Sequence, residues 1–170
     1  DELLTKEMII EMNKILKRNT SDEDNPRYNV GGFKIVPNII GVVNVIQTTA
    51  PENVEKEIDE LLNEYNAKIH ITLEDIVDFH FRFEKIHPFQ DGNGRIGRFI
   101  ILKQCLECNI DLIAIDDKYD DEYRNALYKA GKTGDSEDLV TVFKKCQKRL
   151  DEKLEKYKSL LEQVDVDMQN

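Results

Sequence analysis

The sequence predicts an all-α fold, a helical bundle with one small β-hairpin. Most apolar residues recur at intervals of three and four, which is the spacing of one buried helix face. A single stretch, about residues 33–47, instead carries β-branched runs separated by turn residues, which is typical of a hairpin. Because this is the one extended element that the pattern predicts, it cannot belong to a large sheet.

In the first half of the chain we expect helix, loop, hairpin and helix. The first amphipathic helix covers roughly residues 1–18, and the polar stretch that follows it reads as a loop. The hairpin is predicted to pair 33–36 with 39–47 across a turn at Pro37-Asn38. The next helix is expected to open just after Pro51, with Asn53 as its cap.

In the second half, four helices are expected. The first opens at a capping box over Thr72–Asp75 and stops before Pro88, and the second ends near Asn109. The third is closed by Gly131. The last covers about 137–163, and its apolar stripe alternates steps of three and four. We therefore expect it to pack on the body and then to project outward.

Length and composition favour a single globular domain over residues 1–170. Hydrophobic residues make up 40% of the chain and charged residues 34%, which suits a folded protein without a membrane span. The net charge of −10 argues against nucleic acid or an anionic membrane as partner, since no broad basic surface is available. A small anionic ligand needs only a local cluster of arginines and backbone amides, so it is compatible with this charge.

The three cysteines predict no disulfide framework, because their number is odd. Cys105 and Cys108 have the spacing of a metal-binding pair, but no second pair or nearby histidine completes a tetrahedral site. We interpret them as small core residues. A reducing cytoplasm is the natural setting, and secretion as an effector is left open.

The segment His87–Arg98, with the sequence HPFQDGNGRIGR, carries the residues for chemistry. A tight loop of two glycines and an asparagine leads directly into a helix start, where exposed amides and the helix dipole favour an anion. Arg95 and Arg98 lie three apart and share one face of that helix, so both can reach one polyphosphate. Asp91 offers an oxygen ligand for Mg²⁺, and His87 can accept a proton near neutral pH. This set predicts phosphoryl or nucleotidyl transfer.

Two other interpretations compete with this one. Gly92, Gly94 and Gly97 satisfy the G-x-G-x-x-G pattern of dinucleotide-binding folds, but that pattern requires a preceding strand and a parallel sheet. The element before it is helical, so we reject this alternative. A purely structural loop is the other. Arginines in a first helical turn are disfavoured by the dipole unless an anion is bound, which favours a functional site.

The segment His87–Arg98 matches the Fic signature His-x-Phe-x-Asp/Glu-Gly-Asn-Gly-Arg-x-x-Arg at every specified position, so the chain resembles the Fic family. The resemblance extends over most of the chain, through the helix before His87 and the segment around Tyr123. It implies a Fic-type helical bundle with a hairpin flap. His80 and His70 lie outside the signature, and we interpret them as a core histidine and a solvated one.

The resemblance also implies roles for individual residues. His87 would be the general base, Phe89 would anchor the loop in the core, and Asp91 would hold Mg²⁺. Tyr123 would lie near the adenine. The resemblance implies that the phosphates are bound by Gly92, Asn93, Gly94, Arg95 and Arg98. It also implies a flap that docks the target by strand addition and consists of Ile39, Ile40, Gly41, Val42 and Val43.

The implied activity is protein adenylyltransfer: AMP moves from ATP, with Mg²⁺, to a Tyr, Ser or Thr hydroxyl of a target protein, releasing pyrophosphate. The loop sequence Asp91–Gly94 favours AMP over the groups that other members transfer. Two alternatives stay open, namely Fic-type transfer of another nucleotidyl or phosphate group, and a catalytically idle binding module. Assembly into a homo-oligomer is also left open.

Overall fold

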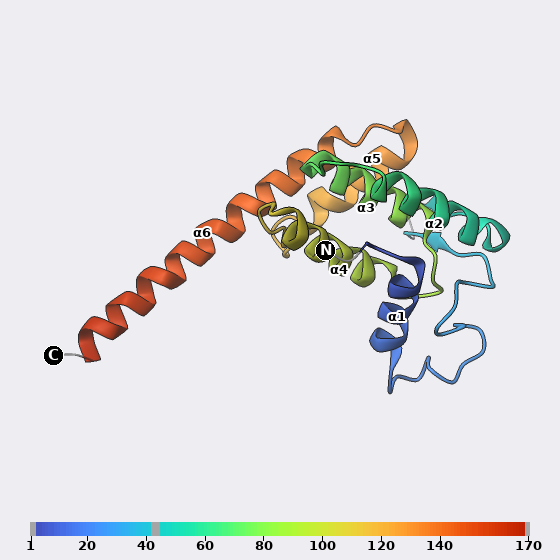
Figure 1. Ribbon diagram of the computed structural model, residues 1–170, viewed down its shortest axis with the longest axis horizontal. Helices are drawn as coiled ribbons and strands as arrows, with labels where there is room; N and C mark the ends of the chain where they lie inside the picture. Colours follow the sequence, from blue (N-terminus) through green and yellow to red (C-terminus); the bar gives the residue numbers. More distant parts are fainter. Residues whose placement is uncertain (1–2, 42–44, 169–170) are drawn as a thin grey trace.

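The computed structural model describes residues 3–41 and 45–168 and confirms the predicted all-α class (Figure 1). One two-stranded antiparallel hairpin accompanies the helices. The elements in chain order are α1 (Lys6–Lys17), β1 (Ile39–Ile40), β2 (Ile46–Gln47), α2 (Pro51–Asn66), α3 (Leu73–Ile86), α4 (Asn93–Cys108), α5 (Asp120–Thr133) and α6 (Glu137–Met168).

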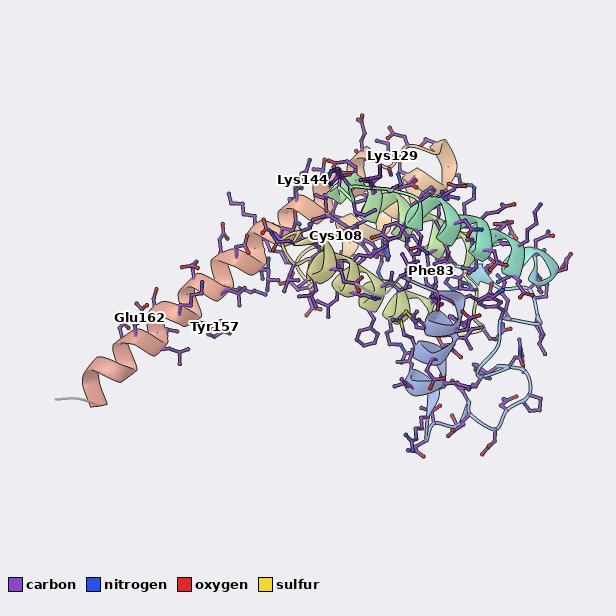
Figure 2. The ribbon with its side chains drawn as sticks, viewed as in Figure 1. Phe83, Cys108, Lys129, Lys144, Tyr157 and Glu162 are labelled. Atoms are coloured by element: carbon purple, nitrogen blue, oxygen red, sulfur yellow. The ribbon has the colours of Figure 1, made fainter. Side chains whose placement is uncertain are left out.

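Helix α3 is central and is buried on nearly every side. Phe79 and Phe83 belong to an apolar cluster shared with α1, α2 and α4, and Figure 2 shows Phe83 inside the body of the molecule. Residues Ile76 and Val77 belong to a second cluster, which α3 shares with α4, α5 and α6. A helix that is apolar on most of its surface is stable only when it is covered in this way. This packing fixes the end of α3, where His87 follows.

Helices α3 and α4 approach each other closely at Gly97. A Cβ atom added at Gly97 would lie 2.8 Å from Oε1 of Glu84 and 3.0 Å from Cε1 of His80, both on α3. An alanine here would force the buried Glu84 carboxylate or the His80 ring to move, because real Cβ atoms do not come so near to other heavy atoms. The contact holds the first turns of α4 against the end of α3.

Gly97→Ala is therefore expected to destabilise the fold by about 1–3 kcal/mol, the usual cost of overpacking a close contact. Gly94→Ala is the matched control, because its Cβ would meet nothing nearer than 3.6 Å and alanine favours a helix. Urea unfolding followed by circular dichroism measures both variants. Equal stability of Gly97→Ala and the wild type would contradict the close packing of the two helices.

The hairpin exists, but its position differs from the prediction. Its strands are β1 and β2, paired Ile39 with Gln47 and Ile40 with Ile46. The predicted strand at 33–36 is wrong, because the backbone N–H of Lys34 donates to the carbonyl of Pro88 at 2.8 Å instead of to a neighbouring strand. Two predicted flap residues, Val42 and Val43, lie outside the described residues.

Four helix ends also differ from the prediction. Helix α1 begins at Lys6 instead of at about residue 1, and helix α6 continues to Met168 instead of ending at about residue 163. Helix α2 begins at Pro51 with Ala50 as its N-cap, so the predicted cap at Asn53 is wrong. Proline at a first helical position needs no side-chain cap to fix its dihedral angle. Helix α5 continues through Gly131 and ends at Gly134, whose left-handed backbone (φ 77°) terminates it.

Other boundaries are confirmed. Thr72 and Asp75 form the predicted capping box at the start of α3, with both reciprocal hydrogen bonds present. Helix α4 ends at Cys108, and Asn109 adopts the left-handed conformation as its C-cap. Cys105 is buried in the core as predicted, whereas Cys108 is only partly buried. Cys146 is also buried, and all three cysteines are free thiols.

Helix α6 packs on the body and then projects away from it, as predicted (Figure 1). Leu139 and Phe143 near its start are buried in the second cluster. Tyr157 and Leu161 are exposed, and Figure 2 shows Tyr157 and Glu162 on the projecting part. Among the described helices, none is both long enough and apolar enough to cross a membrane.

Candidate active site

His87 stands at the end of α3 in a left-handed backbone conformation (φ 51°, ψ 60°). Its N–H donates to the carbonyl of Phe83 at 2.9 Å, which closes the helix, and Pro88 prevents continuation. Its ring nitrogen Nδ1 lies 3.2 Å from the backbone carbonyl of Glu84. Because a carbonyl can only accept a hydrogen bond, Nδ1 carries the proton and Nε2 keeps its lone pair.

The surroundings of His87 keep its ring neutral. Burial lowers the pKa of His87 to about 4, although the hydrogen bond to the Glu84 carbonyl acts in the opposite direction. The charge of Lys34 lowers this pKa further. At physiological pH the imidazole is therefore unprotonated at Nε2 and can accept a proton.

The loop after His87 is held by two buried side chains, Phe89 and Asn93. The amide of Asn93 accepts from the backbone N–H of Phe89 and donates to the carbonyl of the same residue, both at 2.8 Å. Gly92 has φ 90°, a conformation that glycine adopts at low cost. The side chain of Asn93 therefore shapes the loop, which leaves its backbone amide as the group that could contact an anion.

The start of α4 has the features of an anion site. The N-cap residue is Gly92, which makes no side-chain capping hydrogen bond. The amides of the first turn are therefore left for an external acceptor, and the helix dipole favours a negative one. Arg95 and Arg98 are exposed near this helix start. Guanidinium groups placed in this way suit phosphate oxygens.

Asp91 is held between two cations. Its carboxylate accepts from Lys17, a nearly buried residue at the end of α1, and from Arg95 at 2.9 Å. Lys17 also contacts Asp22 at 2.5 Å. Burial alone would raise the pKa of Asp91, but the hydrogen bond and charge of Lys17, the Gly92 amide and the charge of Arg95 together outweigh it and lower the pKa. Asp91 is thus ionised, as a metal ligand must be.

The donor set around Asp91 fits Mg²⁺ only together with a nucleotide. Within the described residues no group of three His, Cys, Asp or Glu side chains could hold an ion. Mg²⁺ commonly uses one or two protein carboxylates and takes its other ligands from substrate phosphates and water. The carboxylate of Asp91, half exposed beside the start of α4, satisfies that requirement.

Glu84 is a further charged group at the site, and it was not predicted. It is buried on α3, and its Oε2 lies 3.7 Å from Nδ1 of His87. Burial raises the pKa of Glu84 to about 7, against the opposing charge of Arg98. The signal in the sequence was an acidic residue on the otherwise apolar face of α3, three positions before His87.

Tyr123, which the resemblance implies to lie near the adenine, is a core residue. Its side chain is buried in the core, where its hydroxyl is 2.8 Å from Nε2 of His80 and its ring stacks with Phe143. His80 is a core histidine as predicted, and burial lowers its pKa to about 3. His70 is exposed, as predicted.

The fold and the site together define a helical domain in which a neutral histidine ends one helix and an anion site begins the next. A sequence profile described as the Fic/DOC family matches residues 3–105. The chain belongs to this family.

Several solved structures share this fold. A Fic domain containing signaling protein from Bacteroides thetaiotaomicron is 26% identical with a TM-score of 0.71, covering 86% of this chain and 60% of that one. Fic-1 from C. elegans is 19% identical with a TM-score of 0.72, covering 95% and 45%. BepC, a VirB-translocated effector from Bartonella tribocorum with bound AMPPNP, is 14% identical with a TM-score of 0.58, covering 85% and 77%. The chain thus spans 60% of the first of these proteins and 45% of the second.

Proposed function

We propose that this chain transfers AMP from ATP to a hydroxyl side chain of a target protein and releases pyrophosphate. The target oxygen attacks the α-phosphorus of ATP, and the bond from that phosphorus to the oxygen that bridges to the β-phosphate breaks. The proton of the hydroxyl passes to Nε2 of His87.

The observation that carries this proposal is the state of His87. Its Nδ1 donates to the carbonyl of Glu84, and burial lowers its pKa to about 4, so that Nε2 is an acceptor at neutral pH. A general base must be unprotonated and must stand beside the reacting group. The uncapped start of α4 lies only six residues along the chain from His87, which supports a phosphate being bound near the base.

The residues of α4 supply the proposed nucleotide site. The backbone amides at Gly92, Asn93 and Gly94 would donate hydrogen bonds to the inner phosphates, and Arg95 and Arg98 would donate to the outer ones. The bound AMPPNP in the BepC structure supports an ATP-like ligand for this fold. Asp91 would hold Mg²⁺, which would supply positive charge to balance the charge of the phosphates.

The hairpin supplies the proposed target site. In the described part of the sheet each strand pairs on one side only, so each has an edge that can accept a further strand. An extended segment of the target would add to the edge formed by Ile39, Ile40 and Gly41. This places the target through backbone hydrogen bonds and leaves its hydroxyl side chain to reach His87.

The test is to incubate the purified chain with α-³²P-labelled ATP, Mg²⁺ and a cell lysate, and to analyse the labelled protein by mass spectrometry. We expect one added AMP group on a Tyr, Ser or Thr. An added phosphate or UMP would refute the stated reaction and support another Fic-type transfer. Absence of any covalent label, with a lysate protein retained by the chain, would support a binding module instead.

A further inference from the structure

We propose that Lys34 is a positioning residue that fixes the hairpin flap, β1 and β2, relative to His87. This inference rests on the proposed function for its catalytic consequence, and on the geometry of described residues for the anchoring itself.

Lys34 has the surroundings of a structural cation. Its side chain is 2% exposed, and its Nζ donates to the backbone carbonyl of Ile86 at 3.1 Å, Oδ1 of Asn38 at 2.7 Å and Oγ1 of Thr48 at 2.9 Å. An ammonium group has three N–H donors, and each has one acceptor here. Because all three acceptors are uncharged, the ammonium group of Lys34 is stabilised by the number and direction of its hydrogen bonds and not by an ion pair.

Two of these acceptors come from opposite ends of the hairpin. Asn38 directly precedes β1, and Thr48 directly follows β2. The hydroxyl of Thr48 also lies 2.7 Å from the carbonyl of Asn38, to which it donates. The ammonium group of Lys34 therefore joins the two ends of the flap. We call Lys34, Asn38 and Thr48 together the flap root.

The same network reaches the residues on either side of His87. Nζ of Lys34 binds the carbonyl of Ile86, the last residue of α3, where the helix dipole favours a cation. The backbone N–H of Lys34 donates to Pro88 at 2.8 Å, and the amide of Asn38 donates to the carbonyl of Phe89 at 2.8 Å. The flap root is thus bonded to the residue before His87 and to the two residues after it.

A buried charge with no acidic hydrogen-bond partner lowers the stability of the fold. We therefore attribute to Lys34 a role in positioning the flap. Burial lowers the pKa of Lys34 to about 8, as expected for such a site. Lys34 is not a candidate base, because its donors are engaged and its side chain is enclosed. Its effect on the reaction is indirect, through the distance and orientation between a target strand on the flap and His87.

The test compares Lys34→Met, which replaces the ammonium by an apolar group of similar length, with Thr48→Val, which removes the bonds of the Thr48 hydroxyl to Lys34 and Asn38 but keeps the ammonium group. Lys85→Met is the matched control, because Lys85 is an exposed lysine on the last turn of α3, directly before Ile86 in the sequence. Hydrogen exchange measured by NMR reports on the amides of β1 and β2 separately from those of α3 and α4.

We expect the flap amides of Lys34→Met to exchange about tenfold faster or more, which corresponds to losing one or two net hydrogen bonds. Thr48→Val should show a smaller change in the same amides, and Lys85→Met none. Unchanged flap exchange in both Lys34→Met and Thr48→Val would overturn the anchoring. A rise in the amide exchange rate that is uniform across all helices would also overturn the anchoring, because Lys34 would then contribute only to overall stability.

The catalytic consequence is measured with the substrate protein recovered from the labelling experiment. In Lys34→Met we expect the KM for that protein to rise about tenfold, with MgATP affinity within about twofold of the wild type, since the phosphates contact α4. A loosened flap with an unchanged KM would overturn the positioning role. If the wild type transfers no AMP, the proposed function fails, while hydrogen exchange still decides the anchoring.

Discussion

His87→Asn is expected to reduce AMP transfer by about 10²- to 10⁴-fold, the usual loss when a general base is removed. Asparagine is chosen because it tolerates the left-handed backbone at this position better than alanine does. The hydroxyl proton would then have no acceptor at the end of α3. ATP binding should persist, because its phosphates are assigned to α4.

Isothermal titration with MgATP and a transfer assay together check this result. His70→Asn is the control, since His70 is exposed in the loop before α3. Transfer by His87→Asn within about twofold of the wild type would remove His87 from the mechanism. A loss of ATP binding as large as the loss of transfer would assign His87 to the nucleotide site instead.

Asp91→Asn is expected to weaken Mg²⁺-dependent ATP binding by about 10- to 100-fold, a loss typical of a damaged metal site. Asparagine keeps the shape of the side chain and removes the charge that attracts the ion. The same titration in EDTA should show wild-type ATP affinity falling toward that of the variant. Full transfer activity in EDTA would refute the metal role.

The structure provides a control for this variant, because Asp91 also contacts the buried Lys17. Asp22→Asn removes the other carboxylate on Lys17 and leaves Asp91 intact. We expect Asp22→Asn to bind MgATP nearly as the wild type does. If both variants lost affinity equally, the effect would come from misplacing Lys17.

The helices and the signature segment were predictable because their determinants are local. The capping box at Thr72 and the stop at Pro88 each depend on residues a few positions apart. The chemistry from His87 to Arg98 is contiguous in the sequence, so one motif showed most of it. The apolar stripe of α6 also predicted that this helix packs on the body and then projects outward.

What the sequence did not predict depends on partners far along the chain. Lys17 meets Asp91 across 74 positions, and Lys34 meets Ile86 across 52. No spacing rule indicates such pairs. Lys34 also lies within a run of β-branched and aromatic residues, which favoured a strand, although its tertiary hydrogen bonds hold this segment outside any sheet.

The left-handed backbone at His87 lowers the stability of the fold, while the histidine at this position is needed for the proposed reaction. A residue with a Cβ atom in this conformation is less stable than glycine by about 1 kcal/mol. A laboratory screen that rewards heat resistance alone would therefore favour glycine at this position and return well-folded proteins without the proposed base. A selection for thermostable variants therefore has to measure AMP transfer as well as thermal stability, or keep position 87 unchanged.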